Sequence, residues 1–274
     1  MPVFRKVGIV SRVDRTDAVN LAVTIAKFIE KKGLAPVFEA DLARLISKKG
    51  VRLDKLVADL IVIVGGDGTI LRTVHAVKSG IPLFSVNMGT IGFLADVSKK
   101  NAYPAVEKIL RGDFIRENCF TIRTNLGLPF ALNEVRVGSD IPQQMVEMSL
   151  LINGKQVVKD KLDAIIVATS TGSSAYALSA GANIVDPRLE ALSIVPVCPF
   201  SSNFKPLIIP STQEVSVKIL SKAVTTILID GQSQRKILSP KEIKIKRSSK
   251  HVTFLRLKDN FYERLRRRLG TSSL

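Results

Sequence analysis

The sequence has few of the residues that build metal sites and disulfide frameworks. Its 274 residues include only two cysteines, Cys119 and Cys198, and two histidines, His75 and His251, all far apart along the chain. A structural zinc site needs closely spaced Cys or His ligands, and a disulfide framework needs several paired cysteines. We therefore expect neither, and we assign no side chain as a ligand of a resident metal ion.

Long apolar runs are also missing. No stretch approaches the roughly 20 apolar residues that a membrane-spanning helix needs, and the first ten residues have no signal-peptide core. Hydrophobic residues nevertheless make up 46% of the chain, which is enough to bury one large core or two moderate ones. We expect a globular, cytoplasmic protein without a membrane partner.

The chain contains no tryptophan, one of the aromatic residues on which bases stack. Its net charge of +17 would nevertheless attract nucleic acid. The positive charge is concentrated, because residues 235–268 hold 13 Lys and Arg against 3 Asp and Glu. No aromatic RNA-binding motif accompanies this basic segment. We therefore interpret it as a solvated basic face and do not expect a nucleic-acid partner.

The most informative stretch is Gly65-Gly66-Asp67-Gly68-Thr69, which separates the apolar run 60–64 from a helix-like stretch beginning at Ile70. An unbroken β-branched run predicts a strand buried on both faces. Glycines allow a sharp turn and let a phosphate approach the main-chain N–H groups, to which the helix adds its own N-terminal amides. The carboxylate of Asp67 would repel that anion, so it indicates chemistry, as a base or a partner for Mg²⁺.

These five residues also permit a plainer interpretation. Asp-Gly is a common turn pair, and a glycine turn often follows a buried strand in α/β proteins. The chain has no Gly-x-x-x-x-Gly-Lys-Ser/Thr motif, and residues 65–71 do not fit the Gly-x-Gly-x-x-Gly dinucleotide fingerprint. If the loop binds phosphate, it is a phosphate loop of another kind.

The order of predicted elements separates the chain into an α/β part and a β-rich part. Asp17 is placed to cap the first helix, which Gly33 ends. The first part is predicted to contain strands 6–10, 35–38, 60–64 and 82–86 and helices 17–32, 70–79 and 103–111, with a short helix or loop at 44–49. From about Asn118 the pattern predicts strands 119–124, 129–137, 145–152, 156–158, 163–168, 191–197, 206–209, 215–220, 224–229, 235–238, 243–246 and 252–257, with one helix at 173–181. A last basic helix, 261–269, carries an apolar stripe of Phe261, Leu265 and Leu269.

Polar residues interrupt the second part at three places. Asn133-Glu134 breaks an apolar strand, so one side chain points inward and needs a hydrogen-bond partner, which a ligand or a bulge could supply. Residues 169–176, Thr-Ser-Thr-Gly-Ser-Ser-Ala-Tyr, carry six hydroxyl groups where a helix cap needs one. Asp230-Gly231-Gln232 is typical of an ordinary tight turn.

Taken together, these motifs resemble those of the NAD kinase family. The resemblance covers nearly the whole chain and runs in the same order: 65–69, Asn87-Met88-Gly89-Thr90-Ile91-Gly92-Phe93, 133–134, 169–187, 196–206 and 230–232. It implies an α/β domain with a mostly parallel sheet, 1–117, joined by a returning segment from about 258 to 274. It also implies an all-β NAD-binding domain, 118–257, and assembly into homodimers or homotetramers.

The same resemblance implies transfer of the terminal phosphoryl group of ATP, or of polyphosphate, to the 2′-hydroxyl of the adenosine ribose of NAD. The reaction would use a divalent metal, Mg²⁺. Asp67 would be the catalytic base. The residues expected to bind the donor and NAD are Gly66, Gly68, Thr69, Arg72, Asn133, Glu134, Lys161, Asp163, Thr171, Ser174, Ala175, Tyr176, Ser179 and Gln232.

Three positions depart from the family pattern. Ser170 stands where proline is usual, Ser174 where threonine is usual, and Asn203-Phe204-Lys205-Pro206 where a Ser-Arg-Pro sequence is more common. Loss of the proline could loosen the loop at 170, whereas Ser174 retains the hydroxyl. The alternatives are a lipid kinase of the diacylglycerol or sphingosine type, which shares the glycine–aspartate motif, and a non-catalytic module that binds dinucleotides or RNA.

Overall fold

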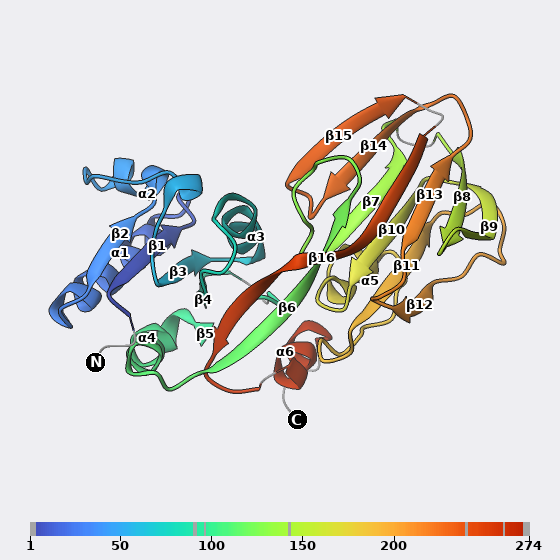
Figure 1. Cartoon of the computed structure of the whole chain (residues 1–274). Helices are drawn as coiled ribbons and strands as arrows, with labels where there is room; N and C mark the ends of the chain where they lie inside the picture. The colour runs from blue at the N-terminus through green and yellow to red at the C-terminus, as the bar shows by residue number, and fades with distance from the viewer. Residues whose placement is uncertain are drawn as a thin grey trace. The chain divides into compact units, whose positions relative to one another are not determined.

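The computed structural model describes residues 4–89, 92–95, 97–141, 144–238, 241–259 and 261–270. It divides the chain into two compact units, 1–118 with 252–274 and 119–251. The sequence placed the return to the first unit at about residue 258, whereas the structure begins it at Val252. The strands β6, Ile115–Thr124, and β16, Lys241–Arg256, each begin in one unit and end in the other (Figure 1).

The first unit is built on a parallel sheet with helices. Its strands pair in the order β2-β1-β3-β4, and the last part of β16 lies beside β4, with Phe254 opposite Leu83. The elements are β1 (Lys6–Ser11), α1 (Thr16–Lys31), β2 (Ala35–Phe38), α2 (Ala40–Leu45), η1 (Leu53–Lys55), β3 (Leu60–Gly65), α3 (Asp67–Ala76), β4 (Leu83–Asn87), β5 (Val97–Ser98), η2 (Lys99–Asn101), α4 (Ala102–Arg111) and α6 (Phe261–Arg268).

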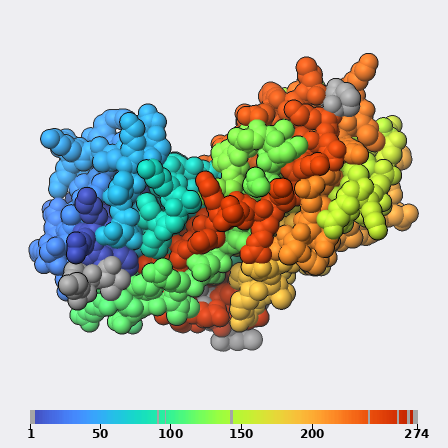
Figure 2. All heavy atoms as spheres, in the orientation of Figure 1, coloured from blue at the N-terminus to red at the C-terminus, as the bar shows by residue number. Residues whose placement is uncertain are grey.

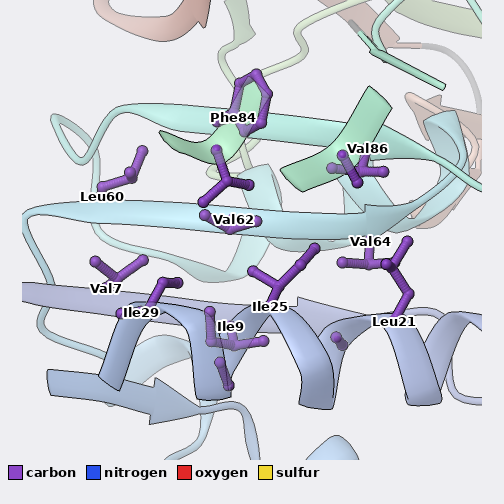
Figure 3. Close-up of a cluster of buried hydrophobic side chains, with 14 of the residues drawn as sticks. Val7, Ile9, Leu21, Ile25, Ile29, Leu60, Val62, Val64, Phe84 and Val86 are labelled. Carbon is purple, nitrogen blue, oxygen red and sulfur yellow. The ribbon is translucent and has the colours of Figure 1, made fainter. Parts of the chain in front are cut away.

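The core of this unit lies between α1 and the sheet. Helix α1 places apolar residues on one face at helical spacing, and β3 is buried along its whole length. Figure 3 shows side chains of the helix and the strands in one packed cluster, which includes Val7, Ile9, Leu21, Ile25, Ile29, Leu60, Val62, Val64, Phe84 and Val86. The buried β-branched run therefore has the surroundings that its sequence predicted.

Two local predictions in the first unit were wrong. Asp17 does not cap α1, since the N-cap is Arg15 and the Asp17 carboxylate instead pairs with the Arg15 guanidinium at 2.8 Å. Where a short helix or loop was expected at 44–49, the structure has a helix that lies earlier, at Ala40–Leu45, because the Glu39 carboxylate accepts the Leu42 amide proton and starts it there. This stretch lies at the surface of the unit, light blue in Figure 2.

The second unit consists of two antiparallel sheets around an apolar core. One sheet has the order β12-β11-β10-β7-β14-β15, and in the other β13 pairs with β16 and with β8, which pairs with β9. The strands are β7 (Glu134–Ser139), β8 (Val146–Ile152), β9 (Lys155–Leu162), β10 (Ala164–Thr169), β11 (Ala191–Val197), β12 (Leu207–Pro210), β13 (Val215–Ile219), β14 (Val224–Ile229) and β15 (Ser233–Leu238). The fold class predicted from the sequence is confirmed in both units.

Both predicted hairpin turns of the second unit are present. Asn153 and Gly154 have φ values of +48° and +77°, and they join β8 to β9. Asp230 and Gly231 have φ values of +48° and +65°, and they join β14 to β15. Positive φ at both central residues is the conformation that Asn-Gly and Asp-Gly pairs favour.

Three other predictions need correction. The helix expected at 173–181 is two short pieces, a 3-10 turn at Gly172–Ser174 (η3) and a single turn of helix at Tyr176–Ser179 (α5). The strands expected at 243–246 and 252–257 are parts of the single strand β16. Among the α6 side chains that the structure describes, Phe261 of the expected apolar stripe is buried together with Arg264, while Leu269 beyond the helix is 58% exposed.

Within the described residues, no helix is long and apolar enough to cross a membrane.

Substituting Ile25 by alanine tests the packing of α1. Ile25 is fully buried in the core of the first unit, and such truncations cost about 2–5 kcal/mol. We expect the free energy of unfolding of this unit, followed by urea denaturation, to fall by that amount. Lys27→Ala, an exposed position on the same helix, should change it by less than about 0.5 kcal/mol. Equal effects of the two substitutions would contradict this account of the core.

Candidate functional site

Three loops of the first unit meet at the carboxyl edge of its sheet. Ser11 at the end of β1 pairs with Val64, and Gly65 at the end of β3 pairs with Asn87 at the end of β4. The Met88 amide donates to the Gly65 carbonyl at 3.2 Å, so the loop after β4 lies against the glycine turn after β3. This edge is where parallel α/β sheets place their ligands.

The three glycines after β3 have different roles. A Cβ on Gly65 would lie 2.5 Å from the Thr69 hydroxyl, so the start of α3 requires glycine there. A Cβ on Gly66 or Gly68 would meet no atom within 4 Å, and neither residue has a positive φ. Contrary to the sequence interpretation, these two glycines are not needed for the turn. They leave open space over the amides at the N-terminus of α3.

The Asp67 carboxylate is held by the backbone of the second glycine-rich loop. The Phe93 amide donates to Oδ2 at 2.9 Å, and the Leu94 amide donates to Oδ1 at 3.2 Å. A Cβ on Gly92 would lie 2.4 Å from Oδ1, so only glycine allows this approach. Each carboxylate oxygen has two lone pairs, and one amide on each leaves acceptor capacity for a further hydrogen bond.

Arg72 faces carboxylates of its own unit. Its guanidinium lies 3.2 Å from the Glu39 carboxylate and 3.6 Å from Asp41, and it donates to the Ser11 carbonyl at 3.4 Å. Its side chain is 35% exposed, whereas Glu39 is 3% exposed. The positive charge expected to face the donor phosphates is thus already balanced by two acidic residues.

In the second unit, the Asp230 carboxylate fixes the turn at residues 132–134. Its Oδ2 accepts the Leu132 amide proton at 2.7 Å, and its Oδ1 accepts those of Asn133 and Glu134 at 2.8 and 2.9 Å. Asp230 is 4% exposed. This residue, expected to be an ordinary turn aspartate, therefore holds the turn that carries the Asn-Glu pair.

The hydroxyl-rich segment packs directly on this turn. The Thr169 hydroxyl donates to the Leu132 carbonyl at 2.6 Å, and the Thr169 amide donates to the Asn133 carbonyl at 2.8 Å. A Cβ on Gly172 would lie 2.0 Å from the Asn133 carbonyl oxygen, so this contact requires glycine. Three motifs far apart in the sequence thus form one site in the second unit.

Two side-chain oxygens of this site have no hydrogen-bond partner within the described part of the chain. Asn133 Oδ1 and Glu134 Oε2 are both buried and unsatisfied, an arrangement that is costly unless a ligand supplies the missing donors. Burial, and after it the charge of Asp230, raises the pKa of Glu134 from 4.5 to about 8. The two oxygens are therefore placed to take hydrogen bonds from a ligand with hydroxyl or amino groups.

The excess of hydroxyl groups at 169–176 has a structural explanation that the sequence interpretation missed. Ser170 binds the backbone at Leu189 and Ala191, and Ser173 donates to the Ser170 carbonyl at 2.7 Å. Ser174 donates to the Thr171 carbonyl at 3.1 Å. These hydroxyls hold a compact loop, and Ser170 anchors it where the family pattern has proline. The Thr171 and Tyr176 hydroxyls have no such bond within the described residues.

The remaining predicted residues lie in three places. Ala175 follows the 3-10 turn, while Tyr176, Ser179 and Gln232 are exposed. Lys161 is the second-to-last residue of β9, and Asp163 precedes β10, in which Ala164 pairs with Gly138 and Ala168 pairs with Glu134. At about 3.3 Å per residue, Asp163 lies roughly 20 Å along the strand from Thr169. One copy of this unit does not bring Lys161 and Asp163 next to the Asn-Glu pair.

No group of three or more His, Cys, Asp or Glu side chains that could hold a metal ion occurs among the described residues. Mg²⁺ commonly binds through one or two carboxylates together with substrate phosphates. The single carboxylate of Asp67, beside the open N-terminus of α3, fits that mode of binding.

Comparisons with known proteins agree with this geometry. Residues 7–114 match the ATP-NAD kinase N-terminal domain, and residues 132–257 match the ATP-NAD kinase C-terminal domain. An NAD kinase of Methanothermobacter thermautotrophicus is 36% identical over 271 residues, which cover 96% of each chain. The chain belongs to the NAD kinase family. An NAD kinase of Thermococcus kodakarensis is 34% identical over 94% of this chain and 96% of its own.

Solved structures of NAD kinases share the fold. The crystal structure of an NAD kinase from Archaeoglobus fulgidus in complex with ATP has a TM-score of 0.82 and 26% identity, and covers 97% of this chain and 99% of its own. Yeast NADH kinase complexed with NADH has a TM-score of 0.91 at 22% identity, which shows the fold alone, and covers 100% of this chain and 89% of its own. Membership in the NAD kinase family, predicted from the motifs, is confirmed.

The sequence did not predict that backbone amides hold the Asp67 carboxylate. It also did not predict that the Asp230 carboxylate holds the turn at residues 132–134. The motif at 87–93 contains Gly92 and Phe93 but gives no sign of their contact with Asp67. Asp230 was expected to be an ordinary turn residue. The one sequence signal for the contact with Asp67 was the glycine at 92, five residues after the end of β4. Backbone donors leave no mark on side-chain identity, so the rest required the structure.

The raised pKa of Glu134 predicts a pH-dependent stability. Between the ordinary pKa of 4.5 and about 8, the folded state holds a proton on Glu134 that the unfolded state has released. Folding stability without ligand should therefore fall as pH rises through that window, by about 1.4 kcal/mol for each pKa unit at most. Glu134→Gln should flatten the dependence, as measured by urea denaturation of the protein from pH 5 to 8.5.

Glu147→Gln serves as the control for that measurement, because Glu147 is a half-buried residue of β8 in the same unit. It should leave the slope of stability against pH as in the wild type. A Glu134→Gln protein with the wild-type slope would show that Glu134 ionises normally.

Proposed function

We propose that the chain is an NAD kinase, which transfers the terminal phosphoryl group of ATP to the 2′-hydroxyl of the adenosine ribose of NAD and gives NADP. The observation that carries the proposal is a family match that includes both units, together with a site in each. The relatives named above are NAD kinases, and the Archaeoglobus fulgidus structure is in complex with ATP.

Asp67 is the proposed general base. A ribose hydroxyl is a poor nucleophile at neutral pH, so a carboxylate must take its proton as the phosphoryl group transfers. The amides of Phe93 and Leu94 fix the orientation of the Asp67 carboxylate. The unused lone pairs on its oxygens can accept the hydroxyl proton.

The N-terminus of α3 is the proposed site for the donor phosphates. The open space over Gly66 and Gly68 lets phosphate oxygens reach the first amides of the helix, which have no partner inside it. Thr69 lies in the same turn and could add its hydroxyl. Mg²⁺ held by the phosphates and by Asp67 would neutralise their charge as the phosphoryl group moves.

The Asn133–Glu134 pair is the proposed site for the adenosine part of NAD. Both unsatisfied oxygens need hydrogen-bond donors, and ribose hydroxyls and the adenine amino group are donors of the right kind. Donation to Glu134 favours its ionised form, so NAD binding near pH 7 should release a proton. The same site is proposed to include Thr171, Ser174, Ala175 and Tyr176.

Other parts of the proposal rest on the family resemblance. Lys161, Asp163, Ser179 and Gln232 are proposed to contact the dinucleotide away from the Asn-Glu pair, and Arg72 to act near the phosphates. We also propose a cytoplasmic homodimer or homotetramer, with polyphosphate as a possible second donor. The lipid-kinase alternative is not favoured, because the relatives named above are NAD kinases.

Substituting Asp67 by asparagine tests the assignment of the base. We expect kcat to fall by roughly 10²- to 10⁴-fold, because general-base catalysis contributes about that factor. The NAD dissociation constant, measured by calorimetry, should change little. Asp54→Asn, an exposed residue of the same unit, is the matched control and should keep full activity. Unimpaired phosphorylation by Asp67→Asn would remove Asp67 from the mechanism.

A matrix of donors and acceptors tests the reaction itself. Purified protein is incubated with ATP or polyphosphate and with NAD, NADH or diacylglycerol, and phosphorylated products are separated by chromatography. We expect NADP from ATP and NAD. Product with diacylglycerol alone would establish the lipid-kinase alternative, and binding of NAD without turnover by any donor would establish a non-catalytic module.

A further inference from the structure

A buried cluster of charges occupies the first unit where the chain returns to it. The Glu117 carboxylate lies 2.6 Å from Arg256 at the end of β16 and 3.3 Å from Arg264 in α6. The side chains of Arg256 and Arg264 are 4% and 6% exposed. Burial acts to raise the pKa of Glu117, but the two arginines outweigh it and lower that pKa.

Arg256 also contacts the loop that holds Asp67. Its Nη1 donates to the Leu94 carbonyl at 2.8 Å, and the Ser85 hydroxyl donates to the same carbonyl at 3.3 Å. The amide of Leu94 is the group that donates to Asp67 Oδ1. The backbone of Leu94 is therefore held through both of its polar groups: its amide donates to Asp67, and its carbonyl accepts from Arg256.

The orientation of Arg256 is itself fixed by several contacts. Its Nε donates to Glu117, and its guanidinium lies over the ring of Phe254 at 4.6 Å. A guanidinium donates from several N–H groups in one rigid plane, so it can bind Glu117 and the Leu94 carbonyl together. A lysine ammonium cannot reproduce that geometry.

We propose that Arg256 is a positioning residue for phosphoryl transfer, because it fixes Leu94 and thereby the loop amides that orient the Asp67 carboxylate. This inference rests on the proposed function, since Asp67 is the base only in that reaction. Arg256 acts through the backbone and touches no reacting atom. Its effect should therefore be on turnover and not on substrate binding in the second unit.

The test compares Arg256→Lys and Arg256→Gln with Ser85→Ala, which removes the other donor to the Leu94 carbonyl with little change of volume. For the Arg256 variants we expect kcat to fall by roughly 10- to 100-fold, since small misplacements of a reacting group cost about that much. The KM for NAD should stay within about threefold. Ser85→Ala should lower kcat by a smaller factor, and its small volume change keeps the test available if the Arg256 variants do not fold.

Hydrogen exchange followed by mass spectrometry gives a second readout that does not depend on activity. Peptides containing Phe93 and Leu94 should exchange faster in the Arg256 variants than in the wild type. Arg264→Gln is the matched control, because Arg264 is an equally buried partner of Glu117, whereas the arginine that donates to the Leu94 carbonyl is Arg256. It should lower the melting temperature while kcat and exchange at Phe93 and Leu94 remain near wild-type values.

Two results would overturn the inference. One is wild-type kcat in folded Arg256 variants or, where these do not fold, in Ser85→Ala. The other is an equal loss of kcat in Arg264→Gln, since the effect would then be one of general destabilisation. If the wild-type protein makes no NADP, the proposed function fails instead. The exchange of Phe93 and Leu94 still decides in that case whether Arg256 holds the loop.

Discussion

The first unit depends on the approach of one carboxylate to one stretch of backbone. Asp67 accepts the amide protons of Phe93 and Leu94, and this is possible only because residue 92 has no side chain. The contact joins the loop after β3 to the loop after β4 and gives the carboxylate a defined direction at the N-terminus of α3. The glycine turn, the second glycine-rich loop and the returning end of β16 all converge on it.

The second unit uses a carboxylate for a different purpose. Asp230 accepts three amide protons and is almost fully buried, so little of its acceptor capacity is left for a ligand. It holds the turn in which Asn133 Oδ1 and Glu134 Oε2 have no hydrogen-bond partner among the residues that the structure describes. In the proposed function one aspartate reacts and the other organises a binding site, although both follow a strand and precede a glycine.

The fold class was predictable from the sequence because it rests on side-chain patterns. Three such patterns each correspond to one feature of the fold: the buried run of β3, the Asn153-Gly154 hairpin and the Asn133-Glu134 interruption. The helix expected at 173–181 failed because its hydroxyls bind the backbone of neighbouring loops, and the α6 stripe failed because Arg264 has a buried acidic partner in Glu117. Contacts to distant backbone groups cannot be recognised from residue type.

The path of β16 has a consequence for how the protein forms during synthesis. Its first residues complete the antiparallel sheet beside β13, and its last residues lie beside β4 and add Leu255 to the core of the first unit. Domains usually fold in the order in which they leave the ribosome. Here the sheet of the first unit lacks this neighbour of β4 until residues 252–256 have been translated, which happens only after the whole of the second unit, so the first unit stays incomplete through that interval.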